Sequence, residues 1–517
     1  MKNRLIVLTT LIFFIGIYFL IDIEGLENLN NSISIENIEC ISSNDIKNVK
    51  KNRKESEYNL IDIKCEDSEI PYDKNNNIYY FSTKKHYNFD VYYDRKTTIK
   101  KIVSKNNITI IAYNKNKYKI YNIKLINLPI VNIDLNNKSN EKNNLISNKN
   151  TNGYISIWNE NNIAIKNSLA KLKVRGSSSI FFDKKSYTIN FIDESGKDLI
   201  KSDVLGMNAD YKYSLNSMYE DNSKIRDVIG MRTWEKLNDN NGLDIKYVEV
   251  IINNNYYGLY ALQEVPTQNS LNIDKDNGIL YKINGYIVPK LSDFNTENNH
   301  FDDTEIIFKG NNVKNKWTPL ENLVDLVYYS DDERFKREIS KYVDIDKEVN
   351  YFILLELMYA SDNRWKNSIF IYEGGKIERT AWDLDGIFGL LWDTTKPLCT
   401  DYNPKLSKEL LCEFDSKALK TYLEQRLWQN NVGNFRQKVA KRWKELRSGF
   451  LETESFVNYA NSLYDEVTES GAREREHERW PDGGYSTDNS FIEKFIRQRL
   501  PYLDIQFLQY LDDSGEN

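Results

Sequence analysis

Two aspartates separated by one leucine are the residues of this chain best suited to bind a metal ion. Asp383 and Asp385 lie in the run AWDLDGIFG, which spans residues 381–389. Alternate side chains of an extended segment share one face, so the two carboxylates can offer oxygen ligands to a single Mg²⁺ or Mn²⁺ ion. The pair therefore predicts a metal site, although an Asp-x-Asp sequence also arises by chance in an acidic chain.

A second acidic cluster lies upstream of this pair. Asp362 and Asn367 are separated by four residues in the run DNRWKN. A protein-kinase catalytic loop uses the same spacing to place a base for the acceptor hydroxyl and an amide ligand for a second metal ion. Either cluster alone is compatible with a solvated loop or turn. Their order and separation in the chain favour a site that binds a metal ion and a nucleotide.

A glycine and three serines form a candidate phosphate-binding turn upstream of the acidic clusters. The run RGSSS, residues 175–179, is followed by Lys184 and Lys185 at the start of a predicted strand through Tyr187. Glycine and hydroxyl groups let the backbone approach phosphate oxygens, and a lysine on the next strand can reach the same oxygens. The spacing differs from a Walker loop, which requires Gly-Lys-Ser/Thr at the start of a helix. The two lysines are expected on opposite faces of the strand.

Length and composition bound the possible functions. A chain of 517 residues exceeds what one compact core usually holds, so two or more domains are expected. The formal net charge is -6 and the basic residues form no stripe, which argues against a nucleic-acid partner. Three histidines are too few for a histidine-based metal site or catalytic triad. Two cysteine pairs, Cys40 with Cys65 and Cys399 with Cys412, permit disulfides in an oxidising compartment.

The N-terminus carries an export signal. Lys2 and Arg4 precede an uncharged, mostly apolar run, residues 5–21, and acidic residues follow it. The run has the length of a short membrane span and no small-x-small cleavage site follows it, so residues 1–24 are predicted to be an uncleaved membrane anchor. The charge distribution places the body of the protein outside the cytoplasm. Cleavage would instead release the body by secretion, and a buried N-terminal helix is the remaining alternative.

The rest of the chain divides by composition and periodicity. Residues 25–60 are polar, without a sustained period, and predict a stalk. Residues 61–126 contain short β-branched and aromatic runs separated by turns, typical of a small β-sandwich-like domain whose tyrosines either stack on sugars or pack within the sheet. Residues 127–510 begin rich in strands and become helical in their second half. There the apolar run 349–360 predicts a buried helix that leads to Asp362.

Six motifs occur in one order between residues 175 and 385 and extend the pattern beyond the acidic clusters. They are RGSSS at 175–179, KKSY at 184–187, LGM at 205–207, Asp221 with Arg226, the segment Tyr257–Glu264, and WDLD at 382–385. In this combination the chain resembles the CotH kinase family over roughly residues 128–505. Several motifs in register make the likeness more specific than any one motif.

The resemblance implies a body related in fold to protein kinases. With the patterns above, the chain is predicted to have an α+β fold with an atypical protein-kinase-like body of two lobes, a strand-rich N-lobe and a helical C-lobe, preceded by the anchor and the β-sandwich-like domain. It also implies transfer of the γ-phosphate of ATP to serine residues, with Mg²⁺ or Mn²⁺ as cofactor. A serine-rich protein of the cell surface or spore coat is the implied acceptor. The protein is accordingly expected to be membrane-anchored and extracytoplasmic.

The resemblance assigns roles to single residues as well. Asp362 matches the catalytic aspartate, and Lys185 is the implied phosphate-contacting lysine. Asn367 and Asp385 match the metal ligands, with Asp383 supporting the metal or its waters. The implied nucleotide-binding residues are Arg175, Ser178, Ser179, Lys185 and Glu264, and Glu264 either partners a lysine or marks the link between the lobes.

The phosphate turn departs from the family pattern at three positions. Ser177 stands for the usual asparagine, Ile180 for a common arginine and Asp183 for a frequent proline. Loss of the arginine removes one phosphate or structural contact, which leaves open a non-catalytic surface-binding protein with a kinase-like scaffold. An Asp-x-Asp glycosyltransferase is a second alternative, since such enzymes hold Mn²⁺ and a nucleotide sugar with this pair. They need neither the spacing of the upstream acidic cluster nor a lysine after the serine turn.

Overall fold

The computed structural model describes residues 29, 31–83, 88–135, 149–176, 178–239, 241–389 and 423–511, with only the backbone at Asn162 and Ser178. The predicted membrane anchor, residues 1–24, and both Cys399 and Cys412 lie outside the described residues. Within these ranges the fold is mixed α+β, with ten α-helices and several β-sheets. No helix in the same ranges is long and apolar enough to span a bilayer.

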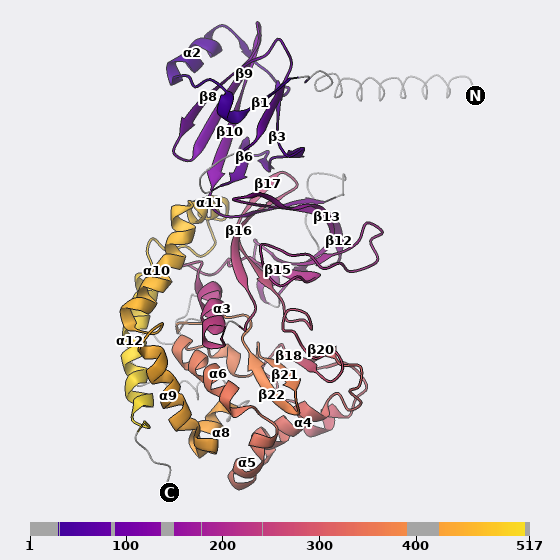
Figure 1. Ribbon diagram of the computed structural model, residues 1–517, viewed down its shortest axis with the longest axis vertical. Coiled ribbons are helices and arrows are strands. Elements are labelled where there is room, and N and C mark those ends of the chain that lie inside the picture. The colour runs from indigo at the N-terminus through magenta and orange to yellow at the C-terminus, as the bar shows by residue number, and fades with distance from the viewer. Residues whose placement is uncertain are drawn as a thin grey trace, which may run out of the picture. The chain divides into compact units, whose positions relative to one another are not determined.

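Compact packing divides the chain into two units. Unit 1 comprises residues 1–144, 153–168 and 249–258, and unit 2 comprises residues 145–152, 169–248 and 259–517. Strands β13 (Asn162–Arg175), β16 (Ile245–Ile252) and β17 (Asn255–Glu264) each continue from one unit into the other. Figure 1 shows the order of the elements along the chain.

Unit 1 contains two β-sheets that share an apolar core. The first has the strand order β1-β7-β3-β4, and the second has the order β5-β6-β10-β9-β8 with β2 beside β10. The strands are β1 (Asn31–Ser34), β2 (Lys54–Glu55), β3 (Ile61–Cys65), β4 (Ser68–Glu69), β5 (Tyr72–Asp73), β6 (Ile78–Ser82), β7 (Asp90–Tyr93), β8 (Thr98–Ser104), β9 (Asn107–Tyr113) and β10 (Lys117–Ile126). Unit 1 also contains β11 (Ile130–Leu135), which pairs antiparallel with β12 (Thr151–Asn159) and parallel with β16.

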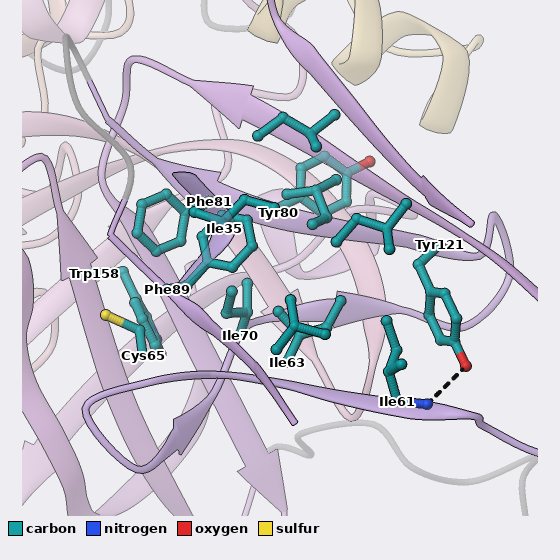
Figure 2. Close-up of a cluster of buried hydrophobic side chains, with 14 of the residues drawn as sticks. Ile35, Ile61, Ile63, Cys65, Ile70, Tyr80, Phe81, Phe89, Tyr121 and Trp158 are labelled. Atoms are coloured by element: carbon teal, nitrogen blue, oxygen red, sulfur yellow. Dashed lines mark hydrogen bonds between the residues drawn. The ribbon is translucent and has the colours of Figure 1, made fainter. Parts of the chain in front are cut away.

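Alternation along the strands builds the core of unit 1. In β3, Ile61 and Ile63 are buried, while the polar residues between them are partly exposed. Figure 2 shows both isoleucines in one cluster with Phe81, Phe89 and other apolar side chains. The hydroxyl of Tyr121 accepts a hydrogen bond from the backbone amide of Ile61 at 3.3 Å. The cluster combines apolar side chains from strands of both sheets, as expected for a two-layer β-structure.

The segment predicted to be a polar stalk differs from that expectation in the structure. Besides β1 and β2, residues 31–60 form the 3₁₀ turn η1 (Ile35–Asn37) and helix α2 (Ser43–Lys51), which is capped by Ser42. Ile35 and Ile38 are buried in the core of unit 1. Hydrophobic periodicity did not predict these elements, because only a few isolated isoleucines anchor an otherwise polar segment. Such a segment has no sustained apolar pattern.

Unit 2 contains two groups of antiparallel strands. In the first, β13 pairs with β14 (Ser186–Phe191), β14 with β15 (Lys212–Asn216), and β15 with β17. The second is a five-stranded sheet of order β19-β20-β18-β21-β22. Its strands are β18 (Ile279–Ile283), β19 (His300–Phe301), β20 (Thr304–Lys309), β21 (Ile369–Glu373) and β22 (Lys376–Thr380).

Helices form the rest of unit 2, and α9, α10 and α12 lie side by side in Figure 1. The α-helices are α3 (Arg226–Leu237), α4 (Thr318–Val324), α5 (Asp332–Glu338), α6 (Ile345–Met358), α8 (Leu423–Asn430), α9 (Phe435–Arg447), α10 (Thr453–Glu469), α11 (Ala472–Arg479) and α12 (Ser490–Leu508). Shorter turns are η2 (Ser178–Phe181), η3 (Leu291–Phe294), η4 (Asp325–Tyr329), η5 (Ile339–Lys341), η6 (Asp362–Arg364) and η8 (Val432–Asn434). Helix α6 is buried on nearly every side, which confirms the helix predicted before Asp362.

Candidate active site

A cavity of about 610 Å³ in unit 2 brings together most of the predicted site residues. Strand β13 ends in the cavity wall, and the loops that follow α6 and β22 supply the acidic residues that the sequence predicted. The predicted residues in the wall are Arg175, Ser179, Asp362, Asn367, Asp383 and Asp385. Cations and carboxylates therefore share one concave surface, which suits a substrate that combines phosphate groups with a metal ion.

Helix α6 delivers the predicted catalytic aspartate. The helix ends where Tyr359 adopts a left-handed backbone with φ 53°, and the 3₁₀ turn η6 begins at Asp362. Within this turn, Asn363 donates its side-chain amide to the carbonyl oxygen of Trp382 at 2.7 Å. This bond holds the two acidic clusters together, although they come from separate loops.

The Asp-Leu-Asp segment is not extended as its sequence suggested. Asp383 adopts φ 59°, and residues 381–385 belong to no strand. Asn367 has a similar left-handed backbone, with φ 56°. Asparagine and aspartate tolerate this conformation better than other non-glycine residues, and it recurs at functional sites. The predicted extended backbone is therefore wrong, although Asp383 and Asp385 both line the cavity.

Helix α3 supports this segment through a buried aspartate that the sequence analysis missed. Asp227 accepts hydrogen bonds from the backbone amide of Leu384 at 2.9 Å and from the side-chain amide of Asn216 at 2.8 Å. Gly230 allows the close approach, since a Cβ atom at this position would lie 2.8 Å from the Cβ of Leu384. Helix α3 thus fixes the backbone between the two predicted metal-binding aspartates. A signal was present, because an acidic residue in a largely apolar helical run requires a partner.

The carboxylates of Asp227, Asp383 and Asp385 repel one another. Desolvation, followed by the charge of Asp383, raises the pKa of Asp385 well above its ordinary range. The same two causes raise the pKa of Asp227 to about 6. A divalent cation would relieve this repulsion, and the oxygens of Asp383, Asp385 and Asn367 are the kind of ligand that Mg²⁺ and Mn²⁺ take. The donor set therefore fits the metal that the family resemblance implied.

The described part of the chain contains no convergent group of three or more histidine, cysteine, aspartate or glutamate side chains suited to a metal. The predicted site has two carboxylates and one amide. Such a set matches the usual binding of Mg²⁺, in which one or two carboxylates act together with substrate phosphates and water.

Three cations face the cavity from the strands of unit 2. They are Arg175 in β13, Lys212 in β15 and Lys282 in β18. The guanidinium of Arg175 lies 5.1 Å and the ammonium of Lys282 lies 5.6 Å from the centroid of the Trp382 ring. Desolvation, followed by the charge of Arg175, lowers the pKa of Lys282 to about 8. A phosphate group would relieve the repulsion between these cations, as the metal would relieve that between the acids.

The structure does not bring Lys185 into this cavity. Its ammonium donates to the carbonyl oxygen of Phe182, and β14 begins only at Ser186, so neither predicted lysine belongs to the strand. Lys184 is buried and forms an ion pair with Glu476 at 2.7 Å. The two lysines do point to different partners, as expected of neighbours. The lysines that line the cavity are instead those of β15 and β18.

Two other predicted nucleotide contacts are not placed at the cavity. Glu264 accepts hydrogen bonds from the backbone amides of Asn208 at 2.6 Å and Asp244 at 3.1 Å, and burial raises its pKa to about 7. It does not belong to the cavity wall and instead organises the backbone near the end of β17. The side chain of Ser178 lies outside the described atoms, whereas Ser179 lines the cavity.

A buried ion-pair network, composed of three arginines and three glutamates, anchors the loop that carries Asp362. Arg364 in this loop pairs with Glu356 at 2.6 Å and with Glu424 at 3.0 Å. The remaining pairs are Arg379 with Glu348 and Glu424, and Arg499 with Glu356. Charges of opposite sign balance within the network, which is the condition for keeping such groups away from water.

Residues 172–503 match the CotH kinase protein family. The match covers more than half of the chain, so the chain belongs to this family and is a kinase-like protein. A comparison with curated proteins finds no match. The family span includes the whole cavity wall and the buried ion-pair network.

Replacing Lys282 with methionine is expected to weaken ATP binding by about tenfold, because a charged partner of the phosphates is lost while most of the aliphatic stem is kept. In the wild-type protein, ATP binding should weaken as the pH rises through about 8, where Lys282 loses its proton. Lys185→Met is the matched control and should bind ATP as the wild type does. Fluorescence titration with labelled ATP measures all three effects, and a reversed ranking of the two variants would restore the original assignment to Lys185.

Proposed function

We propose that this protein is an ATP- and divalent-metal-dependent protein kinase that phosphorylates serine residues outside the cytoplasm. One observation carries the proposal: a single cavity combines the predicted base Asp362, the candidate metal ligands Asn367 and Asp385, and a group of cations suited to phosphate. A glycosyltransferase would require only the Asp-x-Asp pair, and a scaffold would require none of this arrangement.

In the proposed reaction, Asp362 accepts the proton of the serine hydroxyl as the serine oxygen attacks the γ-phosphorus. Lys212 and Lys282 hold the phosphates, and Arg175 beside Trp382 contributes a further positive charge. A metal ion on the candidate ligands would neutralise the charge of the β- and γ-phosphates. The loop anchored by the buried ion-pair network keeps the base in position, which is a large part of what phosphoryl transfer requires of a protein.

The proposed location and partners follow from the N-terminal sequence and from the family. The apolar run after Lys2 and Arg4 supports a membrane anchor with the body on the extracytoplasmic side. A serine-rich protein of the cell surface or spore coat is the proposed acceptor. The unit 1 β-structure is proposed to present the kinase-like part of the chain or to bind a surface component.

Incubation of the full chain with γ-labelled ATP, Mg²⁺ or Mn²⁺, and a serine-rich polypeptide tests the proposal. We expect metal-dependent incorporation of phosphate into serine, detected by phosphoamino-acid analysis, and no incorporation after chelation of the metal. Binding of a nucleotide sugar in place of ATP would favour the glycosyltransferase alternative. Binding of neither nucleotide would leave a scaffold whose activity lies in surface binding.

A further inference from the structure

Tyr286 contacts the predicted catalytic base directly. It lies in the segment between β18 and η3, and its hydroxyl donates a hydrogen bond to Oδ1 of Asp362. The ammonium of Lys366 lies 2.6 Å from the other carboxylate oxygen of Asp362 and 4.9 Å from the centroid of the Tyr286 ring. Both oxygens of the base therefore already accept a hydrogen bond from the protein itself.

Among these three side chains, Tyr286 faces the solvent most openly. Asp362 is 7% exposed and the side chain of Lys366 is 22% exposed, whereas Tyr286 is 38% exposed. Of the groups around the carboxylate, Tyr286 therefore has the largest exposed fraction. Lys366 is the less accessible partner and holds the oxygen on the other side of the base.

Hydrogen bonds to its backbone anchor the segment that carries Tyr286, independently of the Tyr286 side chain. The indole Nε1 of Trp365 donates to the backbone carbonyl of Ile287 at 3.2 Å, which ties the segment to the catalytic loop. Residues 284–290 form no helix or strand, and the Ile287 side chain is exposed. Rotation of the Tyr286 side chain would thus leave the backbone anchor in place.

The hydrogen bond from Tyr286 to Asp362 is of the same kind as the one that an acceptor hydroxyl must donate. A general base must accept a hydrogen bond from the hydroxyl that it deprotonates, at a distance near 3 Å. The phenol of Tyr286 makes this O–H to carboxylate contact with Asp362. It therefore occupies a hydrogen-bonding position that a serine hydroxyl of the acceptor, or a water molecule, would otherwise take.

We propose that Tyr286 selects the acceptor: its hydroxyl holds the acceptor position on Asp362 until a bound protein hydroxyl replaces it, and it excludes water from that position meanwhile. This inference rests on the proposed kinase function. A protein acceptor bound nearby presents its hydroxyl at high local concentration and can replace the phenol. A water molecule has no such additional contact, so the tethered phenol protects ATP from unproductive hydrolysis.

The transfer step itself needs no covalent role for Tyr286. The acceptor oxygen forms a bond to the γ-phosphorus, the bond from that phosphorus to the bridging oxygen breaks, and ADP leaves with the electron pair. The proton of the acceptor passes to Asp362. Tyr286 only exchanges its hydrogen-bond partner, and it can return to the carboxylate after the product leaves.

Tyr286→Phe in the full chain tests the inference, because it removes only the hydroxyl. With a serine-rich polypeptide as acceptor, we expect the acceptor KM to fall about three- to tenfold, as for loss of a competing hydrogen bond to a charged group, with kcat within about twofold of the wild type. ATP hydrolysis without acceptor should rise by a similar factor. Tyr329→Phe is the matched control, since the hydroxyl of this half-exposed tyrosine donates to the backbone carbonyl of Pro289 at 3.4 Å and not to Asp362, and it should change neither rate.

A fall in kcat with an unchanged acceptor KM would overturn the inference and show that Tyr286 instead holds Asp362 in place. Unchanged kinetics and hydrolysis in a variant with the wild-type melting temperature would overturn it as well. A wild-type chain that binds ATP but transfers no phosphate to any acceptor would refute the proposed function itself, a result separate from either of these.

Discussion

Asp362→Asn is expected to lower phosphoryl transfer by about 10²-fold or more while ATP binding remains close to that of the wild type. Asparagine keeps the size of the side chain and can still accept a hydrogen bond from Lys366, which now lies 2.6 Å from the carboxylate. It cannot take up the proton of the acceptor hydroxyl. The chemical step should therefore fail while the cations and metal ligands that hold the nucleotide are unchanged.

Initial-rate measurements with labelled ATP, together with calorimetric titration of ATP, separate these two effects. Asp346→Asn is a suitable control, since Asp346 lies at the exposed start of the same helix and forms an ion pair with Lys438 at 2.6 Å. Loss of ATP binding in Asp362→Asn would show that Asp362 is a metal ligand, and full transfer activity would show that another group is the base.

Asp385→Asn is expected to weaken metal-dependent ATP binding by about 10²-fold, because one carboxylate ligand of the metal is lost. The same change should raise the melting temperature of the protein without metal and nucleotide. Desolvation and the charge of Asp383 raise the pKa of Asp385, so its ionised form is disfavoured in the folded state. Stability of the wild type should therefore fall as the pH rises above the ordinary aspartate range, and the neutral asparagine should remove the part of this dependence that Asp385 contributes.

Titration of ATP binding with Mg²⁺ and thermal melting across about pH 4 to pH 8 test the two parts of this expectation. Addition of Mg²⁺ and ATP should stabilise the wild type and have little effect on the variant. A variant that melts at a lower temperature than the wild type in the absence of ligands would show that Asp385 makes stabilising contacts in the empty site, and the charge argument would then be wrong.

The acidic half of the site was predictable because its residues lie close together in the sequence and their spacing is typical of a metal-binding and catalytic loop. Asp362 and Asn367 are close in sequence, and the second cluster is brought beside them by the bond from Asn363 to the carbonyl of Trp382. The cationic half was not predictable in the same way. Lys212 and Lys282 lie on different strands of unit 2, and only tertiary pairing brings them to one cavity with Arg175. In the sequence, a single lysine within a strand cannot be distinguished from an ordinary surface residue, because the sequence does not show which residues face it across the cavity.

Local pattern also gave a wrong prediction at two places, one for the backbone and one for a side-chain contact. The run Asp383 to Asp385 satisfies the alternation of a strand, yet the bonds made by Asp227 and Asn363 select a left-handed turn at Asp383. Lys185 follows the serine turn closely enough to suggest a phosphate contact, but the carbonyl of Phe182 takes its ammonium. At Asp383 long-range hydrogen bonds outweighed the local preference, whereas at Lys185 a hydrogen bond within the same turn did so. Helix α6 was predictable because an unbroken apolar run leaves few alternatives to a buried helix.

The buried ion-pair network around Arg364 has a consequence for how the protein responds to ionic strength. Its charges are shielded from solvent ions, so added salt cannot screen them effectively. The cations of the cavity, in contrast, are partly exposed, so added salt would screen their attraction for the phosphates of ATP. Salt should thus raise the KM for ATP and leave the geometry of the catalytic loop intact. In a saline environment the protein would therefore lose affinity for ATP well before its catalytic loop lost its order. Lowering the salt concentration alone would then restore its activity.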